Sequence, residues 1–399
     1  MRFIHTSDWH LGKTLDGHSR LNEQEKFCEE FINIVNQNNI DMIIIAGDIY
    51  DTPNPNAESE NLFYKTVSKI SNNGQRCVLI ISGNHDDPKR LEASSHLAKE
   101  QGIIILGSHL SYASSFKYKN FEIIKGKEGC LKLTINNEKI VVITLPYPSE
   151  KRLDELIINS TNYIDNQQSY SKKIGDIFRE LEENFEEDTI NIATSHLFVK
   201  GGESTESERP IEFGKSLVVE KKDLPNNAQY VALGHLHKSQ KASERLNAYY
   251  SGSPLQYSKE ERLNTKGAYI VDIKAGEKAN IEQVYFNNYK PIEVFTCDGI
   301  KEAVNICIEN RNRDIWSYFE IKTDKEISKN DVKNMKDILK DIIEIKSIRT
   351  SINNVDYNNS KEKTMGELFK EFYTFSSEIE PKGELMDLFM EIISEEGDI

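Results

Sequence analysis

Short motifs rich in aspartate, asparagine and histidine recur along the chain, and their side chains could bind divalent metal ions. A mixed set of carboxylate, amide and imidazole ligands suits manganese or iron better than magnesium, which prefers oxygen, or a closed structural zinc site. Two such ions about 3.5–4 Å apart can hold a phosphoryl group and activate a water molecule. The motifs therefore predict phosphoester hydrolysis, and the candidate residues are Asp8, His10, Asp48, Asn84, His85, His196, His235 and His237.

Each motif follows an apolar run that predicts a short buried strand. These strands are expected at 2–7, 41–46, 78–81, 190–195 and 229–233, and a further strand and loop at 249–257 should approach the same edge. Open α/β sheets bind their ligands at the carboxyl ends of parallel strands. A capping turn or an exposed loop would explain any one motif taken alone. The recurrence of one structural context favours a shared site.

Composition limits the class of protein. The chain has 399 residues with a net charge of −15, which argues against coating nucleic acid by bulk electrostatics but leaves a nuclease possible, because bound metals or a partner could supply positive charge. Its five cysteines are scattered and form no Cys-x-x-Cys pair, so they predict neither a disulfide framework nor a zinc site. No apolar run approaches a membrane span, and no signal-peptide pattern precedes the first strand, so we expect a cytoplasmic protein.

The pattern of expected elements predicts three parts. Residues 1–287 alternate strands and helices and hold all the motifs, with helices expected at 21–36, 57–71 and 90–101. Residues 288–353 form a compact α+β module without metal-type residues, and residues 354–399 combine a polar linker with helices.

Two amphipathic stripes mark the C-terminal tail, separated by Pro381 and Gly383. They could dock on the chain's own core or on a groove or helix of a partner. The predicted partner-binding residues are Met365, Leu368, Phe369, Phe372, Tyr373, Leu385, Leu388, Phe389 and Ile392.

The motifs together resemble the five-part motif set of the calcineurin-like metallophosphoesterases. More narrowly, six motifs resemble the nuclease subunits of bacterial SbcCD complexes, over about residues 1–275: Thr6 to Gly12, Gly47 to Asp51, Gly83 to Pro88, Ser195 to Val199, Leu233 to His237 and Ser251 to Leu255. The resemblance implies a sandwich of two mixed sheets flanked by helices, with a small α+β capping domain and C-terminal helices.

The resemblance also implies roles for individual residues. One metal would bind Asp8, His10, Asp48 and His237, and the second would bind Asp48, Asn84, His196 and His235. His85 would contact the scissile phosphate and assist the leaving oxygen. Asp51, where archaeal and eukaryotic relatives tend to carry histidine, would orient His85 or simply cap a loop.

The activity implied by the resemblance is manganese-dependent DNA cleavage, with magnesium or iron as alternative metals. It comprises 3′-to-5′ exonuclease action on double strands and endonuclease action on single strands and hairpins, by a homodimer that works with an SbcC-like coiled-coil ATPase. The dimer surface would involve helices near 57–71 and 90–101. Basic side chains beside the motifs could contact DNA phosphates or remain solvated: Lys13, Lys89, Arg90, Lys200 and Lys238.

Two other functions fit parts of the sequence. A phosphatase or cyclic-nucleotide phosphodiesterase could use the same metal core, although such an enzyme needs no partner-binding tail. A subunit without catalysis could tether an ATPase through residues 365–393, but the complete ligand set argues against it.

Overall fold

The computed structural model describes residues 1–149, 163–208, 217–348 and 365–377, together with five single positions between 381 and 389. It divides into two compact units. The large unit comprises Met1–Phe295, Asn310–Tyr318 and Leu339–Glu344, and the second comprises Thr296–Glu309, Phe319–Ile338 and Ile345–Ile399. The boundaries at 288 and 354 expected from the sequence stay predictions.

A six-stranded sheet carries the first half of the candidate site. Its order is β18-β17-β1-β4-β5-β6, in which β1, β4, β5 and β6 run parallel to one another and β17 runs antiparallel to β1. The strands are β1 (Arg2–Thr6), β4 (Met42–Ala46), β5 (Cys77–Ile81), β6 (Ile103–Leu106), β17 (Gly267–Asp272) and β18 (Asn280–Tyr285).

An eight-stranded sheet carries the second half, in the order β15-β16-β14-β11-β10-β9-β8-β7. Strands β10, β11, β14 and β16 are parallel, and both ends of the sheet are antiparallel. The strands are β7 (Phe116–Lys117), β8 (Phe121–Lys127), β9 (Cys130–Ile135), β10 (Glu138–Leu145), β11 (Ile190–His196), β14 (Tyr230–Gly234), β15 (Gln240–Lys241) and β16 (Ala248–Tyr250).

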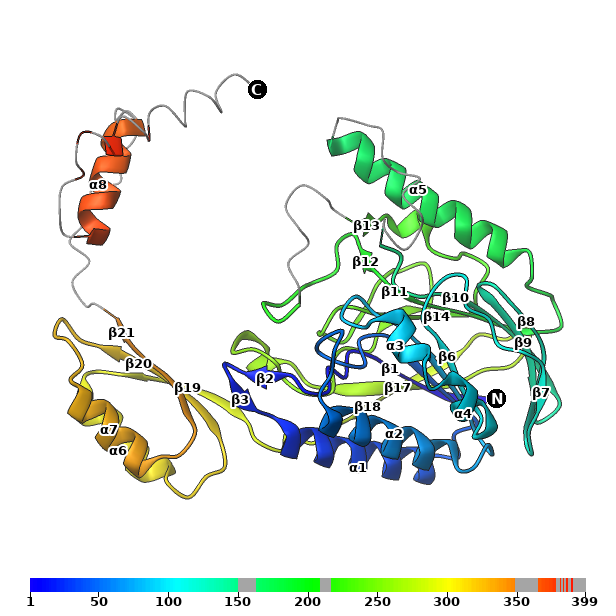
Figure 1. Cartoon of the computed structure of the whole chain (residues 1–399), viewed down its shortest axis with the longest axis horizontal. Helices are drawn as coiled ribbons and strands as arrows, with labels where there is room; N and C mark the ends of the chain where they lie inside the picture. The colour runs from blue at the N-terminus through cyan, green and yellow to red at the C-terminus, as the bar shows by residue number, and fades with distance from the viewer. Residues whose placement is uncertain are drawn as a thin grey trace. The chain divides into compact units, whose positions relative to one another are not determined.

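Side chains alternate between the two faces of each strand, and the inner faces of the two sheets pack together as a sandwich. In β4, Ile44 and Ala46 enter a core shared with Ile192 and Ala232 of the other sheet, whereas Ile43 packs on the helix side. Helices α1 (Leu21–Gln37) and α2 (Ala57–Ser71) cover the outer face of the first sheet, and α5 (Tyr163–Glu182) covers that of the second (Figure 1). This arrangement agrees with the mixed two-sheet sandwich expected from the sequence.

One expected helix is divided. Residues 90–101 contribute to α3 (Pro88–Glu92) and α4 (Ser95–Glu100) instead of forming one continuous helix. The side chain of Asp87 caps α3 by accepting from the Arg90 N–H at 2.8 Å, and Glu92 accepts from the Gly107 N–H at 2.6 Å. The bond from Gly107 ties the end of α3 to the loop after β6, where the helix stops.

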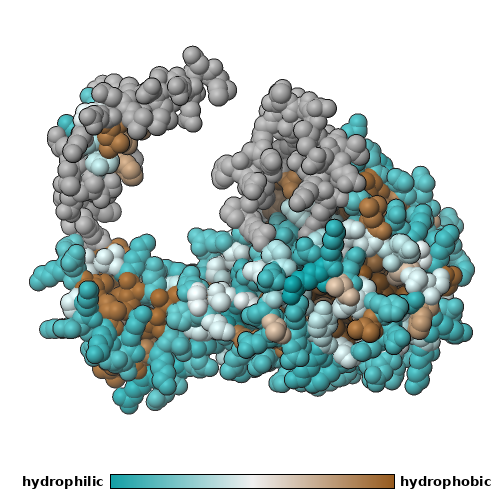
Figure 2. All heavy atoms as spheres, in the orientation of Figure 1, coloured by the Kyte–Doolittle hydropathy of each residue, from teal (hydrophilic) through white to brown (hydrophobic). Residues whose placement is uncertain are grey.

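Short elements complete the large unit. They are the pair β2 (Thr14–Leu15) and β3 (His18–Ser19), the pair β12 (Phe198–Val199) and β13 (Val218–Val219), and the 3₁₀ turns η1 (Lys221–Asp223) and η2 (Glu260–Leu263). On the face in view in Figure 2, hydrophilic side chains cover most of the large unit, as the charged composition leads one to expect.

Residues 292–348 form a three-stranded sheet of order β19-β20-β21 with two helices, as the sequence predicts for an α+β module. The elements are β19 (Ile292–Cys297), α6 (Ile300–Asn310), β20 (Trp316–Lys322), α7 (Lys329–Ile338) and β21 (Ile342–Ile348).

Helix α8 (Met365–Ser377) contains the first apolar stripe of the tail. The Phe369 ring stacks on Phe389 of the second stripe, with centroids 3.8 Å apart, whereas Phe372 is 67% exposed. The predicted partner residues Leu388 and Ile392 lie outside the described residues. None of the described helices has the length and apolar character needed to cross a membrane.

Candidate metal centre at the strand ends

The two sheets bring the predicted ligands to one edge of the sandwich. The first sheet supplies Asp8 and His10 after β1, Asp48 after β4, and Asn84 after β5. The second sheet supplies His196 at the end of β11, and His235 and His237 after β14. Strand pairing explains the convergence, because each sheet contributes the carboxyl ends of adjacent parallel strands.

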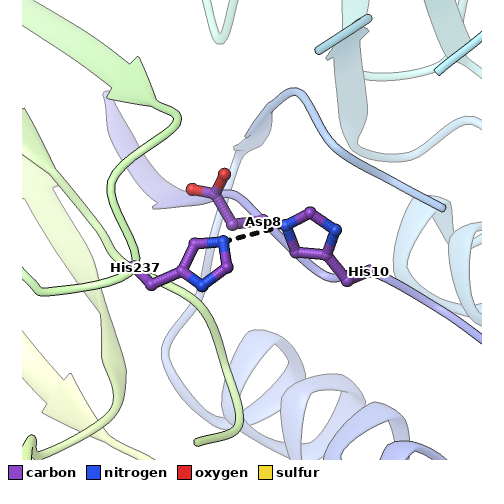
Figure 3. A group of neighbouring side chains, drawn as sticks. All are labelled: Asp8, His10 and His237. Atoms are coloured by element: carbon purple, nitrogen blue, oxygen red, sulfur yellow. Dashed lines mark hydrogen bonds between the residues drawn. The ribbon is translucent and has the colours of Figure 1, made fainter. Parts of the chain in front are cut away.

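The first cluster contains Asp8, His10 and His237, whose possible ligand atoms lie within 4.8 Å of one another (Figure 3). The Nε2 atoms of the two imidazoles face each other at 2.9 Å. All three side chains are buried, with at most 1% exposed. Two imidazoles and a carboxylate that converge in a buried space are typical of a transition-metal site.

Asp48 lies between this cluster and a second one. Its Oδ2 atom is 3.5 Å from the Nε2 atom of His10 and 3.4 Å from the Nε2 atom of His196. Its other oxygen, Oδ1, accepts the backbone N–H of His85 at 2.8 Å, which fixes the carboxylate. Oδ2 therefore faces both clusters, and the bridging role expected for Asp48 stays a prediction.

The second cluster centres on the side-chain oxygen of Asn84. Its Oδ1 atom lies 2.9 Å from the Nε2 atom of His196 and 3.0 Å from the Nδ1 atom of His235. His196 donates its Nδ1 proton to the carbonyl of Ala46 at 2.8 Å, which directs its Nε2 atom at the cluster. Oxygen and nitrogen donors therefore converge here as well.

Two glycines leave room for the ligands, Gly83 within the first sheet and Gly47 between the two sheets. A Cβ atom at Gly83 would lie 2.0 Å from the Asp48 Oδ1 atom, and one at Gly47 would lie 2.3 Å from the His196 Nδ1 atom. Gly47 also has a φ of +91°, which residues other than glycine rarely adopt. The glycine in the Gly-Asp and Gly-Asn-His motifs is thus required by space around the ligands.

Burial controls the charges of several ligands. It lowers the pKa of His235 to about 3 and that of His10 well below its usual value, so both imidazoles are neutral and can bind metal. Burial also pushes the pKa of Asp48 upward, but the nearby imidazoles, above all His196, bring it well below its usual value. Although burial opposes it, Asp48 in turn raises the pKa of His196 to about 9.

His85 stands beside the ligands, with its ring centroid 4.6 Å from that of His10. Its Nδ1 atom donates to the backbone carbonyl of Asp51 at 2.6 Å, while the carboxylate of Asp51 is 3.8 Å away. That carboxylate instead accepts from Lys13 at 2.9 Å. The backbone of Asp51 therefore makes the closer contact with His85, and a catalytic role for the side chain stays a prediction.

Comparison with known proteins identifies the family. Residues 1–239 match the calcineurin-like phosphoesterases, and this match includes every predicted metal ligand. The chain belongs to this family.

Within the family, the sequence is similar to the SbcD subunits of bacterial nucleases. It is 37% identical to the SbcD subunit of the SbcCD nuclease of Bacillus subtilis (strain 168) over 99% of this chain and 98% of that protein. It is 27% identical to the SbcD subunit of Staphylococcus epidermidis over 80% of this chain and 79% of that protein. The same-named protein of Staphylococcus saprophyticus is 28% identical over 82% of this chain and 80% of its own length.

A second layer of this phosphoesterase site was missed by sequence reasoning. Ser207 lies 2.5 Å from the Nδ1 atom of His237 and also contacts Glu261, which is fully buried and pairs with Lys266. Glu208 accepts the backbone N–H of His237 at 2.7 Å. Burial tends to raise the pKa of Glu261, but Lys266 brings it well below its usual value, so the carboxylate is charged.

Four of the five predicted DNA-binding side chains contact carboxylates of the same chain. Lys200 pairs with Glu220 at 2.7 Å, Arg90 with Glu60 at 3.0 Å, Lys238 with Glu203, and Lys13 with Asp51 as described above. Lys89 is exposed on α3. These contacts neutralise much of the positive charge near the site, and the DNA-binding role of all five stays a prediction.

Proposed function

We propose that this chain is the metal-dependent nuclease subunit of an SbcCD-like complex and hydrolyses DNA phosphodiesters in DNA repair and recombination. The observation that carries the proposal is similarity to the SbcD subunit of the Bacillus subtilis SbcCD nuclease over 99% of the chain, which extends beyond the phosphoesterase region into the capping module and tail. A metallophosphatase that shared only the catalytic core would not need this additional length.

Two divalent ions fit the donor set. Asp8, His10, Asp48 and His237 would hold one ion, and Asp48, Asn84, His196 and His235 would hold the other. The mixture of imidazole and oxygen donors favours manganese, with iron or magnesium as alternatives. When bound, such ions would polarise the phosphodiester and supply the attacking water.

The protein's own groups provide orientation and proton transfer. Asp48 is fixed by the backbone N–H of His85, so its other oxygen stays between His10 and His196. His85 donates its Nδ1 proton to the carbonyl of Asp51, so a doubly protonated His85 would contact the phosphate through its Nε2–H and deliver that second proton to the leaving oxygen. Asp51 would then position His85 through its backbone, with its carboxylate held by Lys13.

Partners would complete the nuclease. The chain's net charge of −15 and the internally paired cations near the site leave little positive surface for a DNA duplex, so an SbcC-like ATPase would supply much of it. The tail helices would bind that ATPase. A homodimer would form through α2 and α4, where Tyr64 and Leu97 are 37% and 74% exposed. Such a complex would act on DNA in the cytoplasm.

The first experiment measures hydrolysis of end-labelled DNA by the purified chain, with Mn²⁺ or Mg²⁺ and with or without the ATPase partner and ATP. Duplex ends test 3′-to-5′ exonuclease action, whereas hairpins and single strands test endonuclease action. We expect stronger cleavage with Mn²⁺ and stimulation by the partner with ATP. Hydrolysis of small phosphodiesters without any DNA cleavage would replace the proposal with a phosphatase or cyclic-nucleotide phosphodiesterase.

A further inference from the structure

The side of His237 that faces away from the metal centre is held by the half-buried Ser207 and, behind it, the buried Glu261. Because its Nε2 atom faces His10 at 2.9 Å, a ligand role requires the proton on Nδ1. That Nδ1 atom lies 2.5 Å from the Ser207 hydroxyl, which in turn contacts the Glu261 carboxylate. Nδ1 therefore donates to Ser207, and Ser207 donates to Glu261.

Glu261 is itself fixed on several sides. It is 0% exposed and pairs with the Nζ atom of Lys266, which is 7% exposed. Lys266 also donates to the carbonyl of His237 at 2.9 Å and to the Ser253 hydroxyl at 2.8 Å. A buried ion pair with this many hydrogen bonds resists rearrangement, because moving either charge leaves the other without a partner.

Ser207 belongs to a polar segment, residues 203–208, that we call the clasp. Besides the bonds of Ser207, several contacts attach the clasp to the phosphoesterase core. Glu208 accepts the His237 N–H at 2.7 Å, Glu203 donates its N–H to Gln240 at 2.9 Å, and Glu206 donates its N–H to Glu260 at 3.3 Å. The outer side chains of the clasp are exposed. The clasp thus connects a metal ligand to the molecular surface.

In the second cluster, His196 is held by a backbone carbonyl instead of a side chain. His196 donates its Nδ1 proton to the backbone carbonyl of Ala46, the last residue of the central strand β4. Backbone support of this kind is rigid because the strand is paired on both sides. In His196 and His237, the ring nitrogen that faces away from the cluster is hydrogen-bonded. Of these two described histidines, only His237 depends on a side chain that belongs to a surface segment.

We propose that Ser207 is a positioning residue for the first metal site and that attachment of the clasp is coupled to occupancy of that site. Ser207 holds the His237 tautomer and ring orientation, and Glu261 with Lys266 holds Ser207. Coupling is reciprocal, so loss of the Ser207 contact weakens the first metal, and metal binding slows opening of the clasp. The inference rests on the two-metal function proposed above.

Isothermal titration calorimetry of the metal-free full chain with Mn²⁺ tests whether Ser207 affects the affinity of the first metal site. Ser207→Ala is expected to weaken one of two sites by about 10- to 100-fold, the usual effect of losing a partner of a metal-bound histidine, and to leave the other unchanged. Ser207→Thr keeps a hydroxyl and is expected to restore much of the affinity. The matched control is Ser204→Ala, an exposed serine of the same clasp.

Hydrogen exchange of clasp peptides tests whether metal binding slows opening of the clasp. Mn²⁺ is expected to slow exchange at residues 203–208 in the unmodified chain and in Ser204→Ala, and to have a smaller effect in Ser207→Ala. Equal Mn²⁺ affinities in Ser207→Ala and Ser204→Ala would overturn the inference, and so would equal weakening of both sites. Uptake of fewer than two ions by the unmodified chain would instead refute the proposed function and this inference with it.

Discussion

Gly83 offers a direct test of the geometry around the carboxylate of Asp48, which we propose bridges the two metals. A Cβ atom at this position would lie 2.0 Å from Asp48 Oδ1 and 2.3 Å from the Asp48 backbone nitrogen, distances that real Cβ atoms do not show. Gly83→Ala therefore has to displace Asp48 by roughly 1 Å, and a displacement of this size costs about 100-fold in rate. We expect DNA hydrolysis to fall by about this factor, with weaker binding of both metals.

The assay combines initial rates on end-labelled duplex DNA with Mn²⁺ stoichiometry by elemental analysis. Gly276→Ala is the matched control, because Gly276 has a φ of +71° but no atom within 4 Å of the added Cβ. The control should lose about 1 kcal/mol of stability through backbone strain and keep its activity. If Gly83→Ala retained both ions and a rate within threefold of the unmodified chain, the assigned position of Asp48 would be refuted.

Three further substitutions or deletions separate the proposed roles. His85→Ala should keep two metals by elemental analysis and lose most hydrolysis, since His85 is assigned to the phosphate; loss of an ion would contradict that assignment. Asp48→Ala should impair both metal sites, and two tightly bound ions in this variant would exclude a bridging role. Deleting residues 360–399 should abolish association with the ATPase, measured by size-exclusion chromatography, while cleavage of short DNA by the nuclease alone persists; unchanged association would disprove the tail assignment.

Local sequence signals were sufficient where the structure depends on neighbours in the chain. Helix α2 spans the expected residues 57–71 because Asn56 accepts the Ser59 N–H at its start and Asn72 adopts a left-handed conformation at its end. The candidate ligands were recognisable for a similar reason, since each follows its own strand and pairing of the strands brings the motifs together.

The second layer of the site lacked any such local signal. Glu261 stands in the charged run Lys259-Glu-Glu-Arg262, a pattern typical of solvated surface, yet it is fully buried by contacts with Lys266 and Ser207. These partners are far apart in the sequence or lie in an irregular loop, so periodicity cannot indicate them. The serine beside a glutamate at 207–208 is the one available hint, and it is too common to identify a site.

Backbone strain at the strand ends links the fold to the proposed chemistry. Asp8, His10, Asp48 and His235 all have positive φ angles, between 44° and 109°, which cost about 1–2 kcal/mol each outside glycine. The first three are held there because backbone bonds continue across the strand ends, from Asp8 N–H to the Gly47 carbonyl and from His10 N–H to the Asp48 carbonyl, each at 3.0 Å. The backbone of the first sheet therefore fixes the positions of these three predicted ligands, and we expect a substitution that releases this strain to stabilise the fold while weakening the metal site.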